Sequence, residues 1–185
     1  NDGSIPATTY PSLKTYPVGA KGIVSVFESG ATPYVWKTTT FTRPASSNLQ
    51  VYELLVRDFV ADRRYKTVAD SLGYLKKLGI NALELMPVAE FSGNDSWGYN
   101  PIFYTAPDKA YGTKNDLKYL IDKCHENGIA VIMDIVLNQA DYENPYVKMY
   151  WDGAKPNATS PFFNPTATHP YSVFFDFTHE GNIFF

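Results

Sequence analysis

One apolar stretch of the sequence carries three side chains that could do chemistry. Residues 129–137 read IAVIMDIVL, so Asp134 lies inside an otherwise apolar run, and Asn138 and Gln139 follow it directly. A carboxylate and two amides can bind a polar ligand through hydrogen bonds. Asp134 can equally be a buried acid that is paired within the core, because buried polar groups are paired whatever they do. The two amides can equally satisfy backbone groups at a strand end.

Aromatic side chains are concentrated in segments that follow apolar runs. The chain has 14 Tyr, 12 Phe and 3 Trp. Trp97 and Tyr99 follow the run at 80–86, and many more aromatic residues lie between Tyr142 and Phe185. Flat aromatic faces suit the stacking of a sugar ring. The alternative is that Trp97 and Tyr99 only pack within a loop and bind no ligand.

Three apolar runs are expected to form the strands that position these residues. The runs are 51–56, 80–86 and 129–137, and amphipathic segments separate them. Nearly continuous apolar runs are typical of parallel strands that are covered on both faces, so the pattern predicts βαβαβ and an α/β fold. The segments that leave the strands are long. In parallel folds the ligand lies at the carboxyl ends of the strands, where the polar and aromatic residues are found.

Two amphipathic helices are expected between the strands. Thr67 with Asp70, and Thr113 with Asp116, have the spacing of a capping box at a helix start. Apolar residues then recur at helical spacing. Each helix is expected to stop at a glycine, and these glycines are Gly79 and Gly128.

The chain is expected to divide into three parts. Residues 1–48 are rich in Pro, Gly, Ser and Thr, with short strand-like stretches at 22–27 and 34–41, and they predict the tail of a small β domain and a linker. Residues 49–139 hold the strands and helices. Residues 140–185 are expected to form a loop insertion after the third strand.

Four motifs resemble a known family. They are VYELLVRDF, LKKLGINALELMPVAEF, SWGYNPIFYTAPDKAYGT and CHENGIAVIMDIVLNQ. In that order they resemble the first three strand units of the α-amylase family of glycoside hydrolases and transglycosylases. The MPVAEF and WGYNP phrases are most similar to its branching-enzyme branch. The resemblance implies the first three βα units of a (β/α)₈ TIM barrel, and a retaining reaction on α-linked glucans.

The resemblance also assigns roles to five residues. The resemblance implies that the ring of Tyr99 stacks on the sugar and that Trp97 supports it. It also implies that Asp134 is the acid that supports the site. Asn138 occupies a position that binds a structural calcium in many members. Gln139 stands where the family usually has a histidine that hydrogen-bonds the same sugar, and an amide can donate there but cannot carry a proton's charge.

The resemblance places no catalytic residue within this chain. It implies a nucleophilic acid, an acid/base and a stabilising acid on the fourth, fifth and seventh strands, beyond Phe185. A complete barrel takes about 250 residues. The 185 residues are therefore expected to be an N-terminal fragment that lacks the catalytic carboxylates and is inactive alone. Open sheet edges predict association with the remainder of the barrel or self-association.

Composition narrows the function classes. The formal net charge of −3 argues against nucleic acid and anionic membranes as partners. Cys124 is the only cysteine, so no internal disulfide can form. The resemblance implies an α-linked glucan such as starch, glycogen or a maltooligosaccharide as the ligand, with no required cofactor. The compartment is left open, since a signal peptide could have been removed.

Three other functions fit the sequence. One is a glucan branching or transglycosylating enzyme. Another is a non-catalytic glucan-binding accessory protein, which the absent acids and Gln139 would allow. Without the resemblance, an open doubly wound sheet that binds a small ligand is a third reading.

Overall fold

The computed structural model describes residues 9, 10, 12–168 and 174–184. The chain forms two compact units, each built from three stretches of sequence. The first unit comprises Asn1–Tyr52, Val56–Leu83 and Lys109–Val131. The second unit comprises Glu53–Leu55, Glu84–Asp108 and Ile132–Phe185. The domain boundaries expected after residues 48 and 139 stay predictions, and parts of both terminal ranges (1–8, 11, 169–173 and 185) lie outside the described residues.

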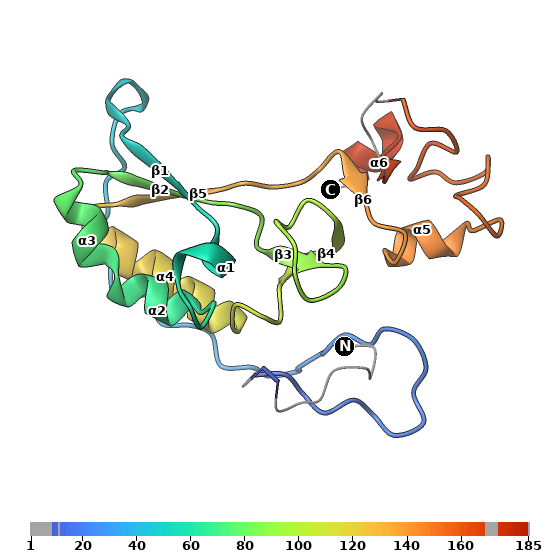
Figure 1. Cartoon of the computed structure of the whole chain (residues 1–185), viewed down its shortest axis with the longest axis horizontal. Coiled ribbons are helices and arrows are strands. Elements are labelled where there is room, and N and C mark those ends of the chain that lie inside the picture. The colour runs from blue at the N-terminus through green and yellow to red at the C-terminus, as the bar shows by residue number, and fades with distance from the viewer. Residues whose placement is uncertain (1–8, 11, 169–173, 185) are drawn as a thin grey trace. The chain divides into compact units, whose positions relative to one another are not determined.

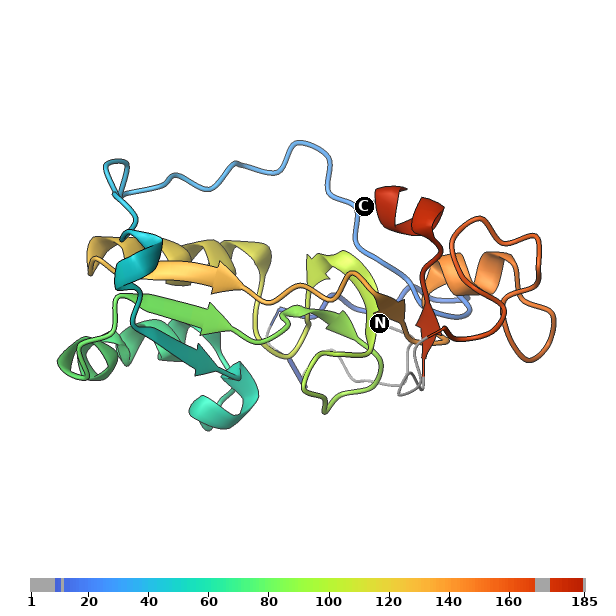
Figure 2. The same cartoon turned by 90° about the horizontal axis from the view of Figure 1, so that it is seen from above.

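The three predicted strands form one sheet. They are β1 (Val51–Leu54), β2 (Ala82–Leu85) and β5 (Ala130–Met133), in the order β1-β2-β5 (Figures 1 and 2). The strand expected to continue to residue 137 is shorter than predicted. A strand extends only while its neighbour offers backbone groups, and β2 ends at Leu85.

Hydrogen bonds give the direction of the strands. The N–H of Ala82 donates to the carbonyl of Gln50 at 3.2 Å, and the N–H of Met86 donates to the carbonyl of Leu54 at 3.0 Å. Donor and acceptor both advance by four residues, so β1 and β2 are parallel. The same step relates the bonds between β2 and β5. The predicted parallel arrangement is confirmed for these strands.

The first predicted helix is divided in two. Short helix α1 (Val56–Phe59) follows β1, and α2 (Tyr65–Asp70) and α3 (Leu72–Lys77) meet at Ser71. The capping box predicted at Thr67 and Asp70 is wrong, because the residue that precedes α2 is Arg64, three residues before Thr67. Tyr65 is fully buried and its ring lies edge-on to Tyr111 at 5.9 Å, so tertiary packing sets the helix start.

The second capping box is confirmed. Helix α4 (Lys114–Glu126) begins after Thr113, whose hydroxyl accepts from the N–H of Asp116 at 3.2 Å. The Asp116 carboxylate in turn accepts from the N–H of Thr113 at 2.9 Å. Positive φ angles of 83° at Gly79 and 75° at Gly128 confirm both glycine stops.

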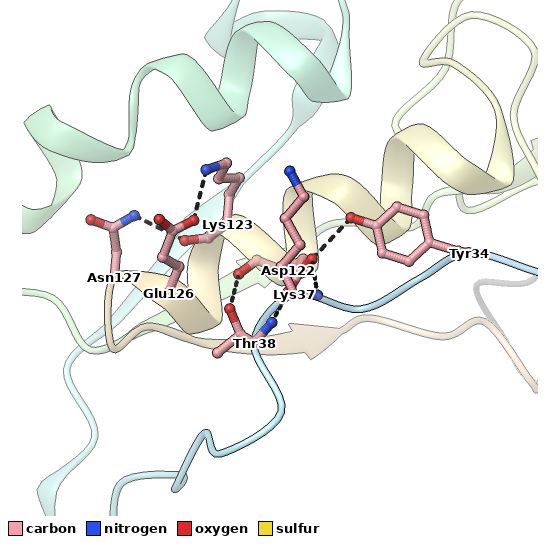
Figure 3. A network of polar contacts seen from close by, with 7 residues as sticks. All are labelled: Tyr34, Lys37, Thr38, Asp122, Lys123, Glu126 and Asn127. Carbon is pink, nitrogen blue, oxygen red and sulfur yellow. Dashed lines mark hydrogen bonds and ion pairs between the residues drawn. The ribbon is translucent and has the colours of Figure 1, made fainter.

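A buried aspartate on α4 holds the segment at 34–38 (Figure 3). Asp122 is 3% exposed, and one of its oxygens accepts from the N–H of Thr38 at 2.8 Å. The other oxygen accepts from the N–H of Lys37 at 2.9 Å and from the hydroxyl of Tyr34 at 3.0 Å. We call these four residues the Asp122 clasp. Burial acts to raise the pKa of Asp122, but the donated hydrogen bonds outweigh burial and lower the pKa below 3.8.

The strands expected at 22–27 and 34–41 are absent from the described part of the first unit. Before β1 the described residues contain one short 3₁₀ helix, Ser46–Asn48. An alternating pattern becomes a strand only where another strand is available for pairing. The clasp instead ties the second stretch to a helix. The small β domain stays a prediction.

The second unit contains two small antiparallel pairs. Strand β3 (Ala89–Phe91) pairs irregularly with β4 (Pro101–Pro107), and β6 (Gln139–Ala140) pairs with β7 (Phe175–Asp176). Two short helices complete the unit, and these are α5 (Pro145–Met149) and α6 (His179–Phe184).

Much of the expected aromatic loop is a packed core. Four buried residues form its centre, and these are Ala140, Val147, Phe163 and Phe177. Partly buried aromatic rings surround them, and these are Tyr104, Tyr146, Trp151, Phe162 and Phe175. Many aromatics of the carboxyl-terminal segment are therefore needed for packing. Among the described residues, no helix is long and apolar enough to cross a membrane.

Candidate functional site

Tyr99 is positioned by a close backbone approach in the loop between β3 and β4. The preceding residue, Gly98, has a φ of +93° and is buried. A Cβ added at Gly98 would lie 2.4 Å from the carbonyl oxygen of Pro87. No side chain fits at that distance, so glycine is required. The loop is thereby held against the residues that follow β2.

The hydroxyl of Tyr99 is fixed by Asp134. It donates to a carboxylate oxygen of Asp134 at 2.6 Å, and the N–H of Asp134 donates to the carbonyl of Leu85 at 3.0 Å. Desolvation by burial and then the Asp134 carboxylate raise the pKa of Tyr99 to about 12, with smaller contributions from Glu53 and Glu84. Tyr99 therefore remains a hydroxyl donor at neutral pH. Asp134 is only half-buried, and its carboxylate holds the hydroxyl end of the Tyr99 side chain.

The main chain of Tyr99 is fixed by Gln139. The Gln139 side-chain amide donates to the Tyr99 carbonyl at 2.6 Å. Gln139 is itself anchored, because its carbonyl accepts from the Tyr104 hydroxyl at 2.7 Å and its backbone pairs with Asp176 of β7. Tyr99 is thus held at its ring end and at its backbone end.

Three of the five predicted site residues come together in the structure. Tyr99, Asp134 and Gln139 are joined by hydrogen bonds. Asn138 is exposed, and its side-chain amide is 3.5 Å from the side-chain oxygen of Gln139. Trp97 is 61% exposed, so its support of Tyr99 stays a prediction.

A calcium ion at Asn138 would need further oxygen ligands. In the part of the chain that the structure describes, no three His, Cys, Asp or Glu side chains lie together as metal ligands. The Asn138 side chain offers one oxygen, and calcium takes six to eight oxygen ligands. Calcium at Asn138 stays a prediction, and no chemistry is assigned to it.

A second polar cluster was missed by the sequence analysis. The Ser92 hydroxyl donates to Glu143 at 2.6 Å, and the Asn100 amide donates to the Ser92 carbonyl at 3.2 Å. Asp141 is 4% exposed, and burial raises its pKa although the N–H of Glu143 donates a hydrogen bond to its carboxylate. The closely spaced acids after Gln139 were a signal, but their partners are about 50 residues away in sequence and no local pattern identifies them.

Comparison with known proteins matches residues 62–180 to the model described as alpha amylase, catalytic domain. The chain belongs to the alpha-amylase family. This confirms the resemblance seen in the motifs, and the fold is that of the family's TIM-barrel catalytic domain, matched in part.

Relatives of two kinds share this family segment. A malto-oligosyltrehalose trehalohydrolase of Saccharolobus solfataricus is 28% identical over 93% of this chain and 28% of its own length. The trehalohydrolase of Deinococcus radiodurans is 32% identical over 77% of the chain and 24% of its own length. A 1,4-alpha-glucan branching enzyme GlgB of Picrophilus torridus is 39% identical over 55% of the chain and 15% of its own length.

A solved structure agrees with this alpha-amylase family assignment. A putative alpha amylase from Salmonella typhimurium superposes with a TM-score of 0.63 at 30% identity, and covers 78% of this chain and 23% of its own. The chain thus spans about a quarter of the length of the first relatives it matches.

Proposed function

We propose that this chain supplies the sugar-stacking part of the site in an α-glucan-active retaining glycoside hydrolase. Tyr99 would stack on a glucose ring, Asp134 would hold its hydroxyl, and Trp97 would extend the aromatic surface. The observation that carries this proposal is the double anchoring of Tyr99 through Asp134 and Gln139. A ring held at both ends presents its face without losing further rotamer freedom when a ligand binds.

The bond-breaking acids are proposed to lie in the remainder of a longer polypeptide. Retaining hydrolysis needs two carboxylates about 5 Å apart on either side of the scissile bond. Asp134 already accepts from Tyr99, which suits a supporting acid better than a nucleophile. The short coverage of the relatives supports the same division. The 185 residues alone would then bind glucan without cleaving it.

The finer fold assignment is also a proposal. The parallel strands β1, β2 and β5 would be the first three strands of the barrel, and residues 1–48 would be the tail of a small β domain and a linker. The predicted association with the rest of the barrel would cover Ile135 and Leu137, which are 60% and 47% exposed.

Transglycosylation is the second candidate. The relative from Saccharolobus solfataricus is named as a trehalohydrolase, whereas the relative from Picrophilus torridus, matched at 39% identity, is named as a branching enzyme. Chain-length analysis of the products formed from a linear glucan separates the two. New short reducing chains indicate hydrolysis, and new branch points at constant reducing ends indicate transfer.

Substitution of Tyr99 tests the proposed platform. In the intact protein, Tyr99→Ala is expected to lower kcat/KM on a maltooligosaccharide by roughly 100-fold, because ring and anchoring are both lost. Tyr99→Phe keeps the ring and is expected to lose far less. Tyr74→Ala removes an equally aromatic but 57% exposed ring on α3 and is the control. Unchanged kinetics for Tyr99→Ala would contradict the proposal.

A further inference from the structure

Gln139 faces the protein, although its sequence position suggests a residue that faces the sugar. We infer that Gln139 is a positioning residue, which sets the plane of the Tyr99 ring by holding its main chain. The inference rests on the proposed function of Tyr99 as a glucan platform. It assigns Gln139 a different task from direct donation to a sugar hydroxyl.

The first support is the direction of the side-chain amide. The Nε2 of Gln139 is 2.6 Å from the carbonyl oxygen of Tyr99. A carbonyl accepts only from a donor, and the amide nitrogen is the donor in glutamine. The short distance indicates a well-formed hydrogen bond. One N–H of the Gln139 amide is therefore engaged before any ligand arrives.

The second support is the anchoring of Gln139 itself. Its carbonyl accepts from the Tyr104 hydroxyl at 2.7 Å, and Tyr104 packs against Phe177 in the aromatic core of the second unit. Next to it, the carbonyl of Asn138 accepts from the N–H of Phe177 at 3.1 Å. The backbone that carries Gln139 is therefore tied to a packed core, and the side chain transmits this rigidity to Tyr99.

The third support is the set of constraints on Tyr99. Gly98 fits against Pro87 on one side, Asp134 fixes the phenol hydroxyl, and Gln139 fixes the carbonyl. With the hydroxyl fixed alone, the ring could still swing about that point. The bond from Gln139 removes this freedom, and binding geometry held this closely is what ligand stacking requires.

A double-mutant cycle separates positioning from direct sugar contact. Gln139→Leu in the intact protein is expected to weaken maltoheptaose binding about tenfold, since the Tyr99 carbonyl loses its donor. In a Tyr99→Ala background the same change is expected to have almost no further effect, because the two residues act as one element. Additive losses would overturn the inference and assign Gln139 a sugar contact of its own.

A measurement without ligand keeps the inference independent of the proposed function. Tyrosine labelled with ¹³C at Cζ gives one NMR signal per ring, and the Tyr99 signal is assigned by its loss in Tyr99→Phe. Gln139→Leu is expected to shift or broaden that signal in the ligand-free protein. An unmoved signal would overturn the positioning role. If the signal moves but the wild-type protein binds no maltoheptaose, the proposed function fails and the role of Gln139 in holding Tyr99 stands.

Two variants guard against misfolding and nonspecific effects. Gln139→Glu has nearly the same shape but no amide donor, and it is expected to reproduce the loss at neutral pH if Gln139→Leu fails to fold. Gln50 is the only other glutamine in the chain and its side chain is exposed, so Gln50→Leu is the matched control. It is expected to leave both the Tyr99 signal and maltoheptaose binding unchanged, and a shift there would overturn the assignment.

Discussion

Two aspartates in this chain each accept a hydrogen bond from a tyrosine, yet the two surroundings differ. In the Asp122 clasp, both carboxylate oxygens are occupied, and the residue is 3% exposed. Asp134 is half-buried, and within the described residues Tyr99 is the one side chain that donates to it. Both tyrosines have a pKa raised to about 12, by burial first and then by the aspartate.

The difference teaches what each carboxylate can still do. A saturated, buried acid such as Asp122 has no acceptor to offer, so its value is structural. A half-buried acid that holds one hydroxyl can still accept from a ligand. A hydrogen bond from a tyrosine hydroxyl therefore does not show whether an aspartate has a structural role or belongs to a binding site. What distinguishes the two is whether the carboxylate can still accept a hydrogen bond from a ligand.

The largest expected effect concerns the backbone beside Tyr99. Gly98→Ala is expected to lower the free energy of unfolding by about 3 kcal/mol, because its Cβ would clash with Pro87 and its φ is +93°. Urea unfolding measures the change. Gly93→Ala is the control, since it has a φ of +76° with no atom within 4 Å of the added carbon. It is expected to cost only about 1 kcal/mol, and equal losses would remove the argument for close packing.

A charge-removing pair tests the comparison directly. Asp122→Asn is expected to lower the free energy of unfolding by about 2 kcal/mol, because an amide cannot accept at both positions. Glucan affinity should stay unchanged. Asp134→Asn is expected to do the reverse, with weaker glucan affinity and little change in unfolding. Asp70→Asn on the exposed end of α2 is the control, and matching effects at Asp122 and Asp134 would break the comparison.

The stabilisation that the Asp122 clasp gives the fold is expected to decrease at acid pH. The folded-state pKa of Asp122 lies below its ordinary value of 3.8, so the folded protein binds fewer protons than the unfolded chain and the clasp stabilises the fold above that value. The stability difference between wild type and Asp122→Asn is therefore expected to be full at neutral pH. It should shrink as the pH falls below 3.8 toward the lower folded pKa. A difference that grows with acid would contradict the assignment.

The contribution of Asp141 to stability is expected to depend on pH in the opposite direction to that of Asp122. Burial raises its pKa above 3.8, so its charged form is disfavoured in the folded state. Its contribution to stability is present at low pH and falls as the pH rises through the raised pKa. The stability of Asp141→Asn relative to wild type should accordingly increase with pH, as guanidinium unfolding at several pH values would show.

The smallest expected effect separates a real helix cap from an apparent one. Thr113→Ala is expected to destabilise the protein by about 1 kcal/mol, because the side chain accepts from the first turn of α4. Thr67→Ala is expected to change stability little, since Thr67 lies within α2 and bonds the exposed Asp62. A larger loss at Thr67 than at Thr113 would restore the predicted cap. Thermal unfolding of both variants is sufficient.

These cases show which features sequence could predict. The Thr113 cap and the glycine stops depend on a few neighbouring residues, and they were predicted correctly. The start of α2 depends on the packing of Tyr65 against Tyr111, far along the chain, and was predicted wrongly. The end of β5 depends on where β2 stops. Features set by neighbouring residues can be predicted from the sequence, whereas helix and strand boundaries set by distant residues cannot.

The candidate site follows the same rule. The positions of Asp134 and Gln139 at the end of the third strand were visible in the sequence. Their hydrogen bonds to Tyr99 were not, because these join residues 35 and 40 positions apart. The inward direction of Gln139 depends on Tyr104 and β7, which no spacing rule connects to it.

The Asp122 clasp also bears on the order of folding. Its bonds join residues separated by 84 to 88 positions, so the chain must close a long loop before any of them forms. Helix α4, by contrast, can form from contacts only a few residues apart. We expect the clasp to close after the transition state for folding, so that weakening it accelerates unfolding while the folding rate hardly changes. The Asp122 clasp would then prolong the lifetime of the folded chain.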